Sequence, residues 1–181
     1  MSKVALFVIG FLSFTKPAIE SIYSHSVISI EGVNKPLSAY QGKKILIVTL
    51  PIQQNASNDS LLHSLDSLQV SYADSIVIIG VPSYEDGYTS TIKTSLTQWY
   101  RSILNQAIVI TEGLYTRKTS GSQQHPLFKW LTDRNKNGHF DKDVEGTRDK
   151  FFVWKDGELT GVLGAQTRIG SSTIRDLLEG Q

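Results

Sequence analysis

The sequence predicts an α/β fold in which helices cover both faces of a central, mainly parallel sheet, with an antiparallel hairpin near the C-terminus. Apolar runs without alternation, typical of strands buried on both faces, take turns along the chain with segments whose apolar residues recur at helical spacing. Near the C-terminus, Asp156-Gly157 separates two apolar runs, which is a strong hairpin signal. The chain has 181 residues, enough for one domain with a well-formed core.

The expected elements follow from this periodicity and from the turn residues between them. Strands are β-prone or continuously apolar runs, and they are expected at residues 27–30, 43–50, 76–81, 107–110, 150–154 and 159–163. Helices are expected around residues 61–72, 92–104, 126–131 and 171–178. Residues 31–34 read as a turn, and the polar stretch 113–124 is expected to form a surface loop.

Residues at the expected helix ends agree with this division. A short polar side chain at an N-cap accepts a hydrogen bond from a free backbone N–H. Pro126 opens a helix where its missing N–H costs nothing, and Gly180 ends the last helix. The candidate N-caps are Ser57, Asn58 or Asp59 for the first helix and Ser171 or Ser172 for the last.

Composition excludes several classes of function. The formal net charge is +1, so the chain lacks the basic excess that a nucleic-acid-binding surface needs. The chain contains no cysteine, which excludes disulfides, cysteine-ligated zinc, a lipidated cysteine anchor and any thiol chemistry of its own. No G-x-S-x-G elbow marks a serine hydrolase.

The N-terminus predicts export. Lys3 precedes a nearly unbroken apolar run over residues 4–14. This run is too short for a stable membrane span, which needs roughly 20 residues, but it fits the core of a signal peptide. We expect removal of residues 1–21, with Ile19 and Ser21 before the cut, and a mature domain of residues 22–181 in the periplasm or outside the cell. The alternative is that the run forms a buried strand of a cytoplasmic protein.

The order of elements and several local stretches resemble one family. A β-α alternation that ends in a hairpin and a helix is the thioredoxin-like arrangement. Within it, residues 37–48 (LSAYQGKKILIV), 125–131 (HPLFKWL) and 150–159 (KFFVWKDGEL) resemble stretches of glutathione peroxidases, as does Ser21-Ile22-Tyr23. The resemblance runs from Ile22 to the C-terminus, and it implies a thioredoxin-like fold and a link to the response to oxidative stress.

The resemblance also implies a chemistry for which this chain has no reactive group. In that family a thiolate or selenolate of low pKa attacks the O–O bond of a peroxide and is then reduced by thiols. The reactive residue follows the first buried strand, and Gln54 stands at the matching position here. An amide nitrogen cannot replace it as nucleophile, because resonance delocalises the lone pair.

Three further positions surround the nucleophile in that family, and all three differ here. A glutamine in the loop after the second buried strand is matched by Glu85. A tryptophan and an asparagine before the hairpin are matched by Gly146 and Thr147. Four departures together, in a chain without cysteine, indicate a protein that kept the frame and lost the reaction.

Two hypotheses about function follow. The first is a pseudoenzyme that binds an unknown protein or small-molecule ligand through a polar pocket near Gln54, Glu85 and Thr147, with no cofactor. The alternative is an enzyme of a different, non-thiol type that uses Glu85 as general acid or base in the same pocket. A deep pocket in which Glu85 has a raised pKa would favour the enzyme.

Residues 133–141 match the first half of a calcium-binding loop. Side-chain oxygens stand at its first, third, fifth and ninth positions, with glycine at the sixth. The acid expected at the twelfth position is absent, so any calcium site is expected to be weak. The alternative is a turn at the end of a helix, in which Asn and Gly take left-handed conformations. The candidate ligands are Asp133, Asn135, Asn137 and Asp141.

Overall fold

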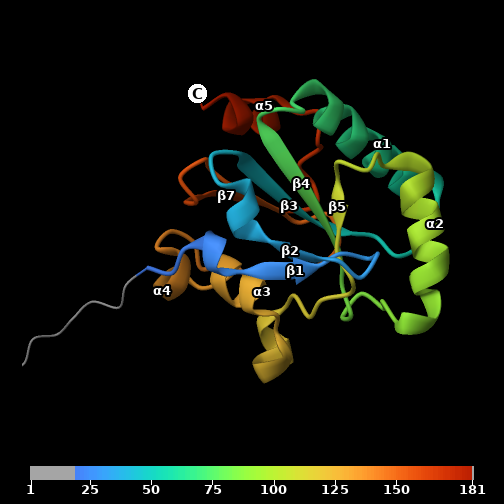
Figure 1. The fold of residues 1–181 in the computed structure, drawn as a ribbon, viewed down its shortest axis with the longest axis horizontal. Coiled ribbons are helices and arrows are strands. Elements are labelled where there is room, and N and C mark those ends of the chain that lie inside the picture. The colour runs from blue at the N-terminus through green and yellow to red at the C-terminus, as the bar shows by residue number, and fades with distance from the viewer. Residues whose placement is uncertain (1–18, 181) are drawn as a thin grey trace, which may run out of the picture.

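A five-stranded mixed sheet organises the chain (Figure 1), in the strand order β5-β4-β3-β6-β7. The computed structural model describes residues 19–180. Strands β3, β4 and β5 are parallel to one another. In the hairpin that the sequence predicts, β6 runs antiparallel to β3 and β7 runs antiparallel to β6. The strands are β3 (Lys44–Leu50), β4 (Ile76–Pro82), β5 (Val109–Ile110), β6 (Lys150–Val153) and β7 (Leu159–Leu163).

Helices cover both faces of this sheet. Figure 1 shows α1, α2 and α5 on one side and α3 and α4 on the other, where the small β1-β2 hairpin also lies. The bounds are α1 (Ala56–Ser71), α2 (Lys93–Ile103), α3 (Pro126–Leu131), α4 (Arg134–Asn137), α5 (Ser172–Glu179), β1 (Ser26–Ile28) and β2 (Asn34–Pro36). Short 3-10 helices lie at Ile22–Ser24, Leu37–Tyr40, Ser90–Ile92 and Lys118–Gln123.

Alternation along the strands divides the apolar residues between two cores. In β3, Leu46 and Val48 pack with α1, α2 and α5, whereas Ile45 and Ile47 pack with α3. All of these side chains are buried, which explains why the strand reads as one continuous apolar run. Full burial of each such side chain contributes about 1.5–3 kcal/mol.

Strand register brings three connections to the same edge of the sheet. Leu50 pairs with Pro82 at the end of β3 and β4, so the loops that follow these parallel strands emerge side by side. Val48 pairs with Lys150 at the beginning of antiparallel β6, so the segment before β6 lies at the same edge. Ligands of open α/β sheets bind beyond the carboxyl ends of the strands.

The beginning of α1 differs from the sequence prediction. Asn55 is the N-cap, and its side chain accepts a hydrogen bond from the backbone N–H of Asn58 at 3.0 Å. The predicted caps lie inside the first turn and have other partners. Asn58 donates to the carbonyl of Gln53, and Asp59 accepts a hydrogen bond from Nε1 of Trp99 at 2.7 Å.

The predicted signal segment lies almost entirely outside the described residues. Its last residues are described, and the carbonyl of Glu20 accepts a hydrogen bond from Nε1 of Trp130 at 2.6 Å. Ile22 is buried in the core on the α3 side. Removal of residues 1–21 and export stay predictions. Within residues 19–180, no helix is both long enough and apolar enough to cross a membrane.

Candidate functional site

Gln54 lies in the loop between β3 and α1, directly before the N-cap Asn55. Its side chain is exposed. The position therefore matches the expectation that this residue follows the first buried strand. The Gln54 side chain supplies only an exposed amide group in this loop.

The three loops that carry the family positions meet at this edge of the sheet. A β-carbon added to Gly87, in the loop after β4, would lie 3.0 Å from Cδ1 of Ile52, in the loop after β3. The hydroxyl of Thr49 donates to the carbonyl of Gly146 at 2.7 Å. A β-carbon at Gly146 would in turn lie 3.9 Å from the Arg117 guanidinium. The loops therefore lie close to one another at this edge of the sheet.

Glu85 holds two of the surrounding loops together. Its carboxylate accepts hydrogen bonds from the hydroxyls of Ser83 (2.5 Å) and Ser120 (2.6 Å). It also accepts from the backbone N–H groups of Thr116 (2.9 Å) and Arg117 (2.9 Å). The side chain therefore ties the loop after β4 to residues 116–120.

These contacts decide the charge of Glu85. Burial by itself would raise the pKa of the carboxyl. The hydrogen bonds from Ser120, Ser83 and the backbone amides of Arg117 and Thr116 outweigh burial and lower the pKa of Glu85 to about 2. A general acid or base works best with a pKa near the operating pH. The geometry therefore makes Glu85 an anchor that is ionised at neutral pH and argues against the acid–base hypothesis.

A second charged pair lies beside this anchor. The Arg117 guanidinium donates to Oδ1 of Asp86 at 2.5 Å, and both side chains are partly buried. Burial raises the pKa of Asp86, with Arg117 acting in the opposite direction. Oδ2 of Asp86 and Nε of Arg117 are buried without a hydrogen-bond partner among residues 19–180. These two atoms are enclosed by the protein and are not accessible from its surface.

Gly146 and Thr147 are followed by a backbone feature that the sequence does not signal. Arg148 has φ of 73°, the only positive φ of a non-glycine residue in the described chain. Its N–H donates to the carbonyl of Thr49 at 2.7 Å, and its guanidinium donates to Oγ of Ser57 and Oδ1 of Asn58 in α1. Left-handed backbone of this kind costs about 1–2 kcal/mol and persists only where surrounding contacts fix it.

An aromatic cluster flanks the Glu85 loop. Tyr84 stacks on Tyr115, with ring centroids 4.7 Å apart, and meets Tyr88 edge-on at 5.3 Å. Tyr84 is 40% exposed. Partly exposed tyrosine offers both an apolar ring and a hydroxyl, and it is enriched at protein interfaces.

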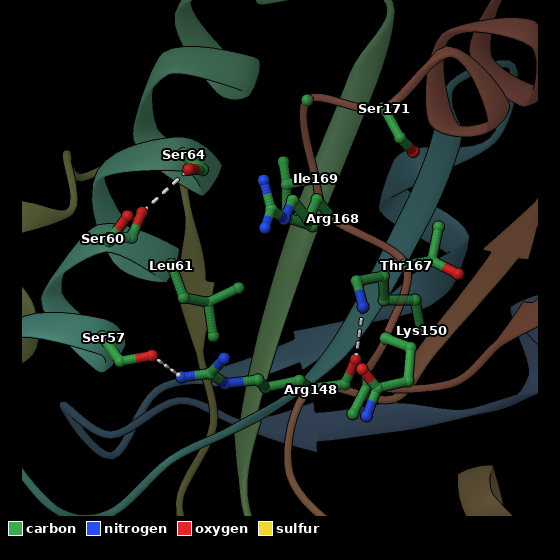
Figure 2. A pocket seen from close by; sticks show the side chains of 13 residues that line it. Ser57, Ser60, Leu61, Ser64, Arg148, Lys150, Thr167, Arg168, Ile169 and Ser171 are labelled. Carbon is green, nitrogen blue, oxygen red and sulfur yellow. Dashed lines mark hydrogen bonds between the residues drawn. The ribbon is translucent and has the colours of Figure 1, made fainter.

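A cavity of about 930 Å³ lies next to these loops, between α1, the beginning of β6 and the segment that connects β7 to α5. Arg148 reaches from one wall of this cavity toward Ser57 of α1 (Figure 2), and Arg168 extends toward α1 from the connecting segment. Lys150 also lines the cavity. None of the four family positions lines it, so reasoning from the sequence missed it.

The residues of the candidate calcium loop are engaged in local structure. Asp133 is the N-cap of α4, and Gly138 ends that helix with φ of 81°. The amide of Asn137 is buried and bonds to backbone groups on both its oxygen and its nitrogen. The Asp141 carboxylate pairs with Lys118. Asn135 donates its N–H to Asp133. These contacts agree with the alternative prediction of a turn at a helix end.

Addition of calcium is expected to leave the melting temperature unchanged, because the loop has formed α4 and has committed Asn137 and Asp141 to other partners. A functional site would add about 1.4 kcal/mol of stability at a calcium concentration ten times the Kd. Thermal unfolding with and without calcium measures this, with Asp133→Ala as control. A rise in the melting temperature of the wild type that Asp133→Ala lacks would establish the site.

Comparison with solved structures identifies the fold class of the chain. The crystal structure of Trgpx in apo form matches with a TM-score of 0.64 at 21% identity, over 88% of this chain and 94% of that one. The crystal structure of T. cruzi GPX1 matches with a TM-score of 0.62 at 15% identity, over 88% and 97% of the two chains. The chain therefore has the thioredoxin-like α/β fold that the sequence predicts.

Sequence comparison with characterised proteins finds similarity to one group of proteins with this fold. The chain is 22% identical to glutathione peroxidase 2 of Sapajus apella over 144 residues, which cover 75% of this chain and 72% of that protein. It is 24% identical to glutathione peroxidase 1 of Caenorhabditis elegans, over 81% and 88% of the two chains. No model of a known protein family matches the chain. The chain thus shows weak homology to glutathione peroxidases, and it contains no cysteine.

Proposed function

We propose that this protein is a non-catalytic binding or interaction module built on the glutathione peroxidase frame. The observation that carries the proposal is Gln54 at the position of the nucleophile, in a chain without cysteine. Peroxide reduction of this type needs a thiolate or selenolate that can be oxidised and then recycled. Neither an amide nor any other side chain of this protein does that.

The loops around Gln54 support a binding role. They are joined by hydrogen bonds and an ion pair, so they present a fixed surface to a ligand. That surface includes the exposed ring of Tyr84, which lies in the same loop as Asp86 and its ion pair with Arg117. Rigid aromatic groups beside a few convergent polar groups are typical of binding sites.

The purified protein is expected to show no thiol-dependent peroxidase turnover. A coupled assay with hydrogen peroxide and either glutathione or thioredoxin should give the rate seen without protein, because the chain has no thiol and Met1 is its only sulfur. Metal-free protein excludes turnover by an adventitious metal, and an active glutathione peroxidase in the same assay is the positive control. Turnover by the metal-free protein above the rate without protein would refute the proposal.

A further inference from the structure

The cavity beside α1 is lined by three cationic side chains and by no acidic one. Lys150 is the first residue of β6, Arg148 lies just before this strand, and Arg168 comes from the segment that precedes α5. None of the three forms an ion pair with a carboxylate of residues 19–180. Asp149, the acid next to Lys150 in sequence, turns Oδ2 toward the backbone N–H groups of Glu145 and Gly146 instead.

Lys150 is held in place as a buried cation. Only 1% of the residue is exposed, and its ammonium donates to the carbonyls of Arg148 (2.6 Å) and Gly164 (3.2 Å). An ammonium has three donors, so one more is available. Burial lowers the pKa of Lys150 to about 8, with Asp149 acting in the opposite direction, so the charge persists at neutral pH. A buried charge without an anionic partner is costly unless something else compensates it.

Serine hydroxyls add donors to the same cavity. Oγ of Ser57 accepts a hydrogen bond from Arg148, and Oγ of Ser171 accepts one from the N–H of Ile174. Each hydroxyl also has its own proton to donate, and neither donates to a residue of the described chain. Leu61 and Ile169 supply apolar surface in the same wall. The cavity thus contains more hydrogen-bond donors than acceptors, beside an apolar patch formed by Leu61 and Ile169.

We propose that this cavity binds an organic phosphate, with the phosphate group among Arg148, Lys150 and Arg168 and the organic part against Leu61 and Ile169. A phosphate monoester carries about two negative charges and three terminal oxygens, which matches several cations and hydroxyl donors better than a carboxylate with one charge and two oxygens. The volume of about 930 Å³ is within the range of small-molecule sites. The proposal does not depend on whether the protein lacks catalysis, because none of the four family positions lines the cavity.

Isothermal titration calorimetry of the whole protein with phenyl phosphate tests this site. Saturable binding to one site is expected, and it should weaken as salt is added. Arg168→Gln should weaken binding about tenfold, as loss of one charge-assisted contact predicts. Arg168 is exposed and has no hydrogen bond from its guanidinium to residues 19–180, so this variant should fold normally. Arg148→Asn should act similarly, since asparagine tolerates positive φ.

Matched ligands and a matched variant make the result decisive. Lys43→Gln removes one exposed positive charge outside the cavity and should leave the affinity unchanged. Benzoate, with a carboxylate in place of the phosphate, should bind at least tenfold more weakly. Absence of saturable binding at millimolar phenyl phosphate would overturn the proposal. Equal weakening by Lys43→Gln and Arg168→Gln, or equal affinity for benzoate, would overturn it as well.

Discussion

Gln54→Cys is expected to remain without peroxidase activity, although it restores the type of residue that the reaction needs. The new thiol precedes the N-cap of α1, and Asn55 already accepts the hydrogen bond from the N–H of Asn58. The first turn is therefore capped and offers the thiolate little stabilisation. Ionised Glu85, in the loop that leaves the sheet beside the loop of Gln54, adds negative charge, and Gly146 and Thr147 replace the aromatic and amide donors of the family. The thiol pKa should be about 8.5 or higher.

The pH dependence of alkylation by iodoacetamide measures this pKa, and the peroxidase assay measures turnover. Ser57→Cys is the matched control, because it places a thiol in the first turn of α1 where the Arg148 guanidinium contacts Oγ of Ser57 at 2.8 Å. A neighbouring cation should lower that pKa below the value in Gln54→Cys. Rapid peroxide reduction by Gln54→Cys alone would mean that a single residue separates this protein from an active enzyme.

The local sequence was sufficient to predict the strands that are buried on both faces and the elements that begin or turn at a characteristic residue. Strands β3 and β4 have continuous apolar runs because each side chain, whichever face it points to, reaches one of the two cores. Helix α3 begins at Pro126 as predicted, and the β6-β7 hairpin turns at Asp156-Gly157. In these cases one local feature, burial or a turn residue, determines the element.

Short elements without an apolar pattern were not predicted. Strand β2 (Asn34–Pro36) is polar, and it is a strand because β1 pairs with it. Helix α4 has only four residues, and the buried amide of Asn137 holds its end by bonding to the carbonyls of Trp130 and Phe140. Neither pattern has an apolar periodicity that could be read from the sequence.

The candidate site, too, was predicted in part. The resemblance placed Gln54, Glu85, Gly146 and Thr147 in loops that do meet at one edge of the sheet. It could not show what Glu85 does, because the groups that bind its carboxylate include Thr116, Arg117 and Ser120, far along the chain. The cationic cavity was missed for a similar reason, since its charged residues resemble ordinary surface residues until folding brings them together.

Glu85→Gln is expected to destabilise the protein by about 3 kcal/mol at neutral pH, because hydrogen bonds to a charged acceptor are among the stronger ones. Glutamine keeps one acceptor oxygen and turns an NH2 group toward donors, so some of the N–H and O–H groups of Thr116, Arg117 and Ser120 lose their partner. Urea unfolding measures the loss. Glu145→Gln is the control, because the Glu145 side chain is 74% exposed and its substitution should change stability by less than about 0.5 kcal/mol.

The same carboxylate should make stability depend on pH in a defined range. The pKa of Glu85 in the folded protein is about 2, below its ordinary value of 4.5. Because folding lowers the pKa, the stabilisation is complete above the unfolded value and is lost as pH falls through 4.5 toward 2. Between about pH 7 and about pH 3, the stability difference between wild type and Glu85→Gln should therefore shrink by about 2 kcal/mol, and by less if solvent screens the partly exposed group. Urea unfolding of both proteins at the two pH values isolates this residue, since all other carboxylates are shared. A difference that stays constant would mean that Glu85 stabilises the loops without its charge.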